Sequence, residues 1–365
     1  MELLLSFTFA TVWMALAYFP GAVDAPQYAQ TLEAARAPVV GDNGADALYA
    51  LEQLPDWPQA LPRCQGEEDC LAVAREHLEA YRALPAETRD ALNAYDATLA
   101  ELNRYGHFRY FVTLNDPIPP FHKLIAANSF NAYRHADGDS DAALQSACLS
   151  ASVARTLLAS QNTLIDSMIG YAQLLKGTQL IAQIRAEKPE LPWPAACDGV
   201  QSLPREHFAV CPLLYGEWYM MRSSMADIMA LQHPEEEWTA LFTAGMARLW
   251  NRQLIANAAY KASRNCEADI LAAVARDEAL APVFTAQEER KHCAPFNLLC
   301  DMAMPDYGEF QVRLLNAYRV LVAFDALRHP EKPLPDFLQR EDGALVLHLH
   351  PARDRATRVV LPLGE

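Results

Sequence analysis

The sequence has few basic residues and no cluster of them. It carries 30 Lys and Arg against 46 Asp and Glu, which gives a formal net charge of −16. Proteins that bind nucleic acid neutralise phosphates with a basic patch or stripe, and this chain has no run of Lys or Arg that would form one. The composition therefore argues against a nucleic-acid partner, and we interpret the acidity as a contribution to solubility.

The commonest catalytic motifs are also missing. The chain contains no G-x-S-x-G elbow, no P-loop, no G-x-G-x-x-G or H-E-x-x-H, and no S-x-x-K nucleophile. It has no repeat of fixed period and no low-complexity tract. These absences remove the best-known enzyme classes, and no cofactor is predicted from any motif.

The cysteines lack the spacings of zinc and redox sites, because the chain has no C-x-x-C and no paired C-x2-4-C. There are eight of them, an even number, which favours disulfides. Local pairing predicts four bonds: Cys64–Cys70, Cys197–Cys211, Cys293–Cys300 and, by elimination, Cys148–Cys266. Disulfides indicate an oxidising compartment. The alternative is eight buried thiols in a cytosolic protein.

The N-terminus carries the clearest local signal. Residues Leu3–Phe19 are seventeen residues without a charge, followed by Pro20. This length is the lower limit for spanning a bilayer and exceeds the usual core of a signal peptide. Residues 1–25 are thus predicted to be an anchor. The alternatives are a signal cleaved after Ala25 and a buried first helix.

Export and disulfides support each other. We expect the body of the protein to lie in the periplasm, anchored in the inner membrane through Leu3–Phe19, or to be secreted if the segment is cleaved.

The longest apolar pattern runs from Asp139 to Glu187. Between Arg155 and Lys176 the only charged residue is Asp166. Apolar residues recur there every three or four positions: Leu157, Leu158, Leu164, Ile165, Met168, Ile169, Tyr171, Ala172 and Leu175. This periodicity predicts one very long, mostly buried helix. We expect an all-α, multi-helix single domain over residues 26–340, organised around this helix.

The C-terminus has a different period. Two short apolar runs, around residues 344–350 and 357–363, flank a six-residue polar turn. Such runs are typical of a β-hairpin, so residues 341–365 are predicted to form a small β-hairpin tail.

Four residues are weak candidates for catalysis. Asp166 is a carboxylate on a narrow polar stripe of an otherwise apolar helix, and a raised pKa in a cleft would suit acid–base work. His107, Arg109 and His122 lie in the aromatic segment 104–122, which could form a ligand platform. The structural alternatives are a solvated or helix-contact face around Asp166 and an aromatic core under a proline-rich corner.

No metal site is predicted. His135, Asp137, Asp139 and Asp141 alternate along the chain, but the sixth and twelfth positions of an EF-hand loop counted from Asp137 are not Gly and Glu. We interpret this stretch as a solvated loop that caps a helix. His348 and His350 share one face of the predicted strand, without a third ligand.

Three functions from different classes are compatible with these features. The first is a binding, accessory or immunity-type protein of the envelope that acts on a protein partner. The second is an enzyme with an unrecognised site near Asp166 and the segment 104–122. The third is a structural component of an envelope complex. The missing motifs, the anchor and the extensive helical surface favour the first.

Overall fold

The computed structural model of the protein describes residues 26–36, 38–64, 66, 68–110, 117–231, 238–293, 307–352 and 357–364. Within these ranges, the side chains of residues 26 and 225–249 are not described. The apolar run Leu3–Phe19 lies outside the described residues, so its role as anchor or signal stays a prediction.

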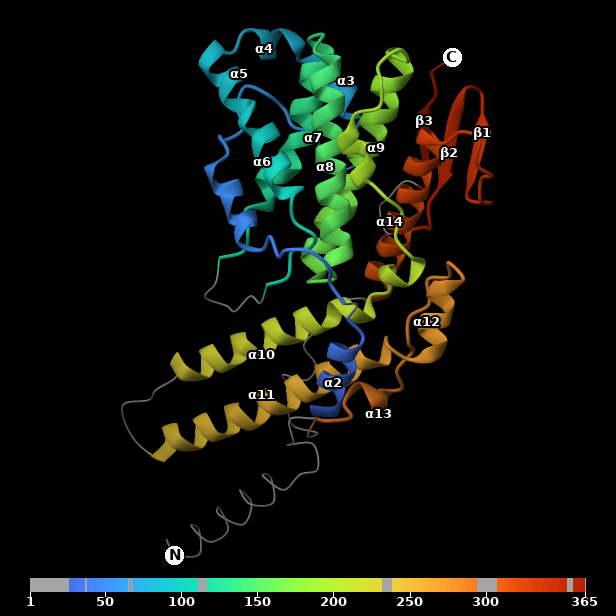
Figure 1. Cartoon of the computed structure of the whole chain (residues 1–365). Coiled ribbons are helices and arrows are strands. Elements are labelled where there is room, and N and C mark those ends of the chain that lie inside the picture. Colours follow the sequence, from blue (N-terminus) through green and yellow to red (C-terminus); the bar gives the residue numbers. More distant parts are fainter. Residues whose placement is uncertain are drawn as a thin grey trace, which may run out of the picture.

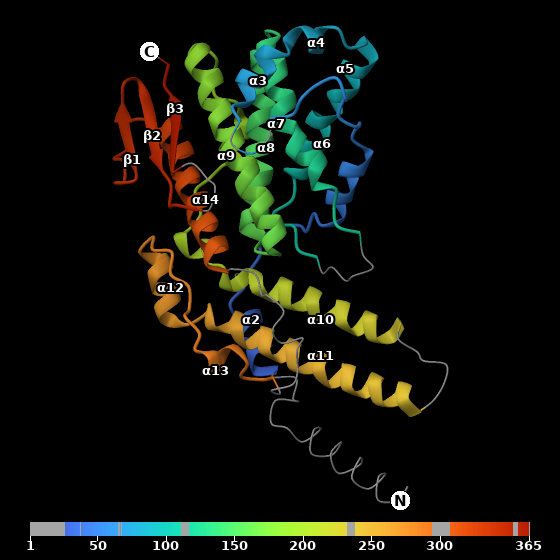
Figure 2. The same cartoon turned by 180° about the vertical axis from the view of Figure 1, so that it is seen from behind.

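Three helices form the middle of the body: α7 (Phe121–Ala136), α8 (Ser140–Ser160) and α9 (Leu164–Glu187). They lie side by side in both views (Figure 1, Figure 2), and α14 (Tyr307–Arg328) packs along α9. Small buried residues of α8, including Ala147 and Ala151, let its neighbours approach closely. The mostly helical fold expected from the sequence is confirmed.

The prediction of a single very long helix over 139–187 is wrong. Helix α8 ends at Ser160, and the next residue, Gln161, adopts the left-handed conformation with a φ of 48°. Helix α9 begins at Leu164. Thr163 caps the new helix, because its Oγ1 accepts a hydrogen bond from the Asp166 amide at 3.2 Å. Two helices therefore replace one, and the chain reverses direction between them.

The reversal places α9 antiparallel to α8, as the positions of two glycines show. A Cβ atom on Gly170 would lie 2.9 Å from the carbonyl oxygen of Ala154, and one on Gly177 would lie 3.6 Å from the Cβ of Ala151. Residues later in α9 thus contact residues earlier in α8, as expected of antiparallel helices. The glycines mark a helix-contact face, one of the two structural alternatives for the polar stripe of Asp166.

Short helices cover the other sides of α7 and α8. They are the 3₁₀ helix η1 (Asp46–Gln53), α3 (Cys70–Glu76), α4 (Leu78–Arg82), α5 (Ala86–Leu92) and α6 (Ala94–Leu102). Their buried leucines and tyrosines, such as Leu48, Tyr81 and Leu99, join one hydrophobic cluster with the central helices. This cluster is the core of the protein.

After α9 the chain passes through three short 3₁₀ helices, η2 (Ala195–Gly199), η3 (Arg205–Phe208) and η4 (Cys211–Leu213). Two long helices follow, α10 (Leu214–Leu231) and α11 (Trp238–Arg264), and α2 (Pro26–Ala34) lies against both. They form a hairpin that extends away from the central helices in both views (Figure 1, Figure 2). The shorter α12 (Ala268–Ala275) and α13 (Ala286–Glu289) come next.

The C-terminus forms a sheet of three antiparallel strands in the order β1, β2, β3. They are β1 (Leu338–Glu341), β2 (Ala344–His348) and β3 (Arg358–Pro362). The hairpin expected from the sequence is the β2–β3 pair, and β1 adds a strand before it through a tight turn at Asp342 and Gly343, both with positive φ. The buried Leu345 and Leu361 face the helical core.

The disulfides confirm one predicted bond and contradict two, one assigned by local pairing and one by elimination. Cys64 is bonded to Cys70, as predicted. The other described bonds are Cys148–Cys197 and Cys211–Cys266, instead of the expected Cys197–Cys211 and Cys148–Cys266. The packing of η2 on α8 explains the difference, because it brings Cys197 to Cys148. The predicted Cys293–Cys300 bond includes Cys300, which lies outside the described residues.

Candidate functional site

Asp166, the strongest catalytic candidate of the sequence, lies in the first turn of α9 and is only 1% exposed. Its Oδ1 accepts a hydrogen bond from the Tyr110 hydroxyl at 2.7 Å, and its Oδ2 accepts one from Asn162 Nδ2 at 2.8 Å. Both carboxylate oxygens are therefore held by protein donors. We name this group of Tyr110, Asn162 and Asp166 the Asp166 cluster.

The electrostatic environment of Asp166 combines two opposing effects. Burial raises the pKa of its carboxyl to about 6, and the hydrogen bonds from Asn162, Tyr110 and Thr163 act in the opposite direction. Among the described residues, its ionised form is stabilised by neutral donors and the start of a helix rather than by a cation. A carboxyl that titrates just below neutrality has the pKa that acid–base chemistry needs.

A second, half-buried carboxyl lies next to the same helix end. Glu217, in the first turn of α10, accepts a hydrogen bond from the amide of Leu164 at 2.8 Å. Burial raises the pKa of Glu217, the bond from Leu164 opposes this, and the charge of Asp166 raises the pKa further. Glu217 is not among the candidate residues predicted from the sequence. Its contact with Leu164 spans 53 residues, so no local pattern indicates it.

The segment before Tyr110 docks onto the junction between α8 and α9. The amide of Phe108 donates to Ser160 Oγ at 2.8 Å, and the Arg109 guanidinium donates to the carbonyl of Ser160 at 2.7 Å. The amide of Tyr110 donates to Asn162 Oδ1 at 3.2 Å. The structure therefore brings Arg109 and the Asp166 cluster to one junction, although Arg109 and Asp166 are 57 positions apart in the sequence.

Arg109 and His107 are both engaged in packing this segment. Burial and the charge of Arg36 lower the pKa of Arg109 to about 10. His107 is 9% exposed, and its carbonyl accepts a hydrogen bond from the amide of Gly44 at 2.8 Å. Its Nδ1 has no hydrogen-bond partner within the part of the chain that the structure describes. Phe108 is fully buried, which supports the aromatic-core alternative for this residue.

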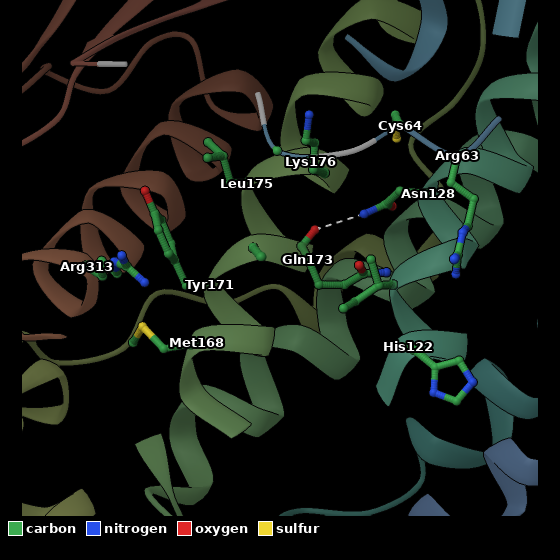
Figure 3. Close-up of a pocket in the computed structure, with 13 residues that line it drawn as sticks. Arg63, Cys64, His122, Asn128, Met168, Tyr171, Gln173, Leu175, Lys176 and Arg313 are labelled. Atoms are coloured by element: carbon green, nitrogen blue, oxygen red, sulfur yellow. Dashed lines mark hydrogen bonds between the residues drawn. The ribbon is translucent and has the colours of Figure 1, made fainter. Parts of the chain in front are cut away.

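His122 lies elsewhere. It is an exposed residue in the first turn of α7, and it lines a cavity of about 440 Å³ that Asp166 does not line (Figure 3). The structure thus brings Asp166 and Arg109 to one junction, whereas His107 pairs with the chain at Asn43 and Gly44 and His122 lies apart at the cavity.

The cavity, which we name the α9 cavity, follows one face of α9. Met168, Tyr171, Leu175 and Lys176 recur on this face at helical spacing and form one wall. A face of α7 with His122, Ile125 and Asn128 forms the opposite wall. Arg63 lines it from the chain just before the Cys64–Cys70 disulfide loop, and Arg313 lines it from α14.

The alternating residues 135–141 are engaged in ion pairs and not in a shared ligand set. Arg82 pairs with Asp137 at 2.7 Å, and Arg134 pairs with Asp139 at 3.4 Å. Asp139 is the N-cap residue of α8, as the capping interpretation predicts. Its side chain makes no capping hydrogen bond. Among the described residues, no group of three or more His, Cys, Asp or Glu is arranged to hold a metal ion.

His350 has a protein partner too. Its Nε2 lies 3.1 Å from Asp277 Oδ1, and Asp277 also accepts two hydrogen bonds from Arg319. The three side chains join the end of α12 to α14 and to the chain after β2. They form a structural ion-pair group.

Comparison with known proteins finds no matching family, no matching curated protein and no matching solved structure.

Proposed function

We propose that this protein is a membrane-anchored or exported helical protein of the cell envelope, which acts as a binding, accessory or immunity-type factor for another protein. The observation that carries the proposal is the hairpin of α10 and α11, which extends beyond the packed body in both views (Figure 1, Figure 2). Two long helices held away from a core offer a surface that a protein partner can contact.

The base of this hairpin is fixed covalently. Cys211 precedes α10 and Cys266 follows α11, so their disulfide joins the two ends of the hairpin across 55 positions. A crosslink there keeps the two helices together at the base. It supports a role in which the hairpin is presented to a partner in a defined direction.

The sequence of the distal hairpin also suits an interface. Residues 238–247 contain no charged residue and include Trp238, Phe242 and Met246. Aromatic residues and methionine are enriched at the centre of protein interfaces, and charged residues are depleted there. This composition favours a protein partner over a solvated arm.

The disulfides support an oxidising compartment for the body. Six cysteines are paired in three described bonds, two of which join positions about fifty residues apart in the chain. Among the described helices, α8 alone has the length and hydropathy of a membrane span, and 72% of the tested window is buried inside the protein. A buried helix of this kind is typical of a soluble core. The membrane link we propose is therefore Leu3–Phe19.

Compartment is tested by a phosphatase fused after Glu365. An active fusion in a bacterial host, together with the absence of alkylatable thiols in the native protein, is the expected result. An inactive fusion with free thiols at the described cysteines would refute the proposed location.

The partner surface is tested by photo-crosslinking of the full chain in its native envelope. A photoreactive residue is placed singly at Thr239, Ala240, Leu241 and Phe242, because four consecutive helix positions sample every direction around α11. We expect a discrete protein adduct from at least one of them. The controls are Val40 and Val283, which are 84% and 88% exposed on the rest of the protein.

Two results would contradict the hairpin as the interface. One is no adduct from any of the four positions, and the other is the same adduct from Val40 or Val283. The variants Asp166→Asn and His122→Ala distinguish the enzyme alternative from the binding and structural roles. An adduct that persists in both variants supports a binding or structural role. A bound small molecule that is lost from either variant, without any protein adduct, supports an enzyme or ligand site instead.

A further inference from the structure

The lining of the α9 cavity differs in charge from the rest of the protein. The chain as a whole carries a net charge of −16, but the described residues that line this cavity include no Asp or Glu. They include four basic or titratable nitrogen side chains, Arg63, His122, Lys176 and Arg313. An electropositive concavity on an acidic protein focuses the field and attracts anions.

The four nitrogen side chains are engaged to different extents. Arg313 is paired with Glu309 at 2.6 Å, which balances its charge, and Lys176 donates to the carbonyl of Glu68. For Arg63 and His122, no hydrogen bond or ion pair occurs within the described part of the chain. Both side chains line the cavity, Arg63 from the chain just before Cys64 and His122 from the first turn of α7 (Figure 3). The Arg63 guanidinium thus has charge and donors left for a ligand, and the His122 ring has hydrogen-bond capacity left.

The position of Arg63 is fixed by the neighbouring disulfide loop. Cys64 is bonded to Cys70, and its amide donates to Ser129 Oγ of α7 at 3.1 Å. The side chain of Arg63 therefore starts from backbone that is tied to the same helix that carries His122. A preorganised cation costs less conformational entropy on binding than a mobile surface side chain.

The remaining lining is mostly apolar. Ile125, Met168, Tyr171 and Leu175 line the cavity, and Ile125 is 39% exposed although it lies on a helix of the core. The volume of about 440 Å³ lies within the range of small-molecule sites. Apolar walls with a few placed polar groups are the usual build of such sites, in which the apolar walls supply affinity and the polar groups fix orientation.

We propose that the α9 cavity binds an amphipathic anion, a molecule with one acidic headgroup on an apolar chain. The headgroup, a carboxylate or a phosphate, lies between the Arg63 guanidinium and the His122 ring, where Arg63 can bind it through two parallel N–H donors. The chain lies on Ile125, Met168 and Leu175.

This site is separate from the hairpin of α10 and α11, so it goes beyond the protein-binding role proposed above. Either proposal can fail without the other. The experiment below reads labelling inside the α9 cavity, whereas the photo-crosslinking experiment reads protein adducts at the hairpin.

The test uses the full chain in nanodiscs and a twelve-carbon fatty acid with a diazirine in its chain. Peptides labelled after irradiation are mapped by mass spectrometry. We expect labelling of the peptides that contain Ile125 and Met168–Lys176. Unlabelled dodecanoate and dodecyl phosphate compete for these peptides, and neutral dodecanol competes about tenfold less well, since the charge contact of a headgroup is absent from it. Stronger competition by dodecanoate assigns a carboxylate ligand, and stronger competition by dodecyl phosphate assigns a phosphate.

Two variants test the lining itself. Arg63→Gln is expected to reduce labelling of the cavity peptides about fivefold by removing the bidentate contact. Ile125→Glu places a negative charge in the wall at a partly exposed position, so it repels the ligand without filling the core. Arg104→Gln is the matched control, because the Arg104 side chain is 75% exposed and does not line the cavity.

Unchanged labelling in both Arg63→Gln and Ile125→Glu would overturn the proposal. Equal competition by dodecanol and dodecanoate would also overturn it, because the cavity would then select for apolar surface alone. Labelling spread over peptides that do not line the cavity is the third contradicting result. Circular dichroism of each variant confirms that the fold is kept.

Discussion

The two sides of α9 differ in where their polar groups find partners. On the side that meets α8 and the junction, the Asp166 carboxylate is surrounded by the donors of Tyr110 and Asn162. On the other side, Arg63 and His122 line an open cavity, and the described residues of its lining include no carboxylate. Satisfied buried polar groups specify a fold, and polar groups left over at a concave surface are available to a ligand. We refer to these as the closed and the open side of α9.

A disulfide supports each side, and the two bonds close loops of very different length. Cys148–Cys197 ties α8, on the closed side, across 49 positions, whereas Cys64–Cys70, on the open side, spans 6. In the chain-entropy account of crosslinks, a longer loop gives a larger stabilisation. The comparison therefore predicts that the closed side depends more strongly on its disulfide.

The largest expected effect follows from this difference. The double variant Cys148→Ser/Cys197→Ser is expected to lose about 4 kcal/mol of unfolding free energy, and Cys64→Ser/Cys70→Ser about 2 kcal/mol. Urea denaturation of both variants and the native protein under non-reducing conditions measures the two losses. A smaller loss from the 148–197 pair than from the 64–70 pair would contradict the assignment.

The next effect concerns the charge on the closed side. The pKa of Asp166 is about 6 in the folded protein and 3.8 as an ordinary carboxyl. The folded state thus binds this proton more tightly than the unfolded chain, so Asp166 removes stability as the pH rises through this interval. Between pH 4 and pH 7 the loss from this group is about 2 kcal/mol.

Asp166→Asn removes this titration. Relative to the native protein, the variant is expected to gain about 2 kcal/mol in unfolding free energy as the pH is raised from 4 to 7, whatever its stability at pH 4. Denaturation curves of both proteins at the two pH values give the difference. A parallel pH dependence of the two proteins would show that the carboxyl is not buried as described.

The contact between α8 and α9 is tested by two glycines. Gly170→Ala is expected to destabilise by about 1 kcal/mol, because the new Cβ would lie 2.9 Å from the backbone oxygen of Ala154. Gly177→Ala is its matched control. Its Cβ meets no atom closer than 3.6 Å, so a gain of about 0.5 kcal/mol from helix propensity is expected. Thermal unfolding of the two variants should shift in opposite directions.

The smallest effect on stability is expected on the open side. Arg63→Gln should change the unfolding free energy by less than about 0.5 kcal/mol, because the side chain makes no described hydrogen bond and lies at a partly exposed position. The same variant is expected to lose labelling of the α9 cavity. A loss of stability above 1 kcal/mol without a change in labelling would assign Arg63 to the fold instead.

Much of the fold can be predicted from local sequence patterns. The helical class follows from the 3.6-residue periodicity, and the C-terminal strands follow from the change to a two-residue period. The Cys64–Cys70 bond could be predicted from spacing, because two cysteines only 6 positions apart stay close in space. The interest in Asp166 also came from the sequence, where it is the only charge in a twenty-residue apolar stretch.

The break between α8 and α9 was missed although its signal is present. Thr163 and Asp166 stand at the spacing of a helix N-cap and the third helical residue, and Gln161 and Asn162 precede them. The apolar pattern continues on both sides of the break, since both helices bury a face in the same core. The apolar periodicity therefore predicts one continuous helix where the structure has two helices joined by a turn.

Tertiary structure alone decided the long-range partners. Tyr110 reaches Asp166, Glu217 reaches Leu164, and Cys148 reaches Cys197 only after α8 and α9 have folded back on each other. The sequence determined which segments are helices and which residues are chemically able to act. The packing of those helices decided which polar groups are satisfied and which face an open cavity, because burial and hydrogen bonding depend on neighbours that are distant in the chain.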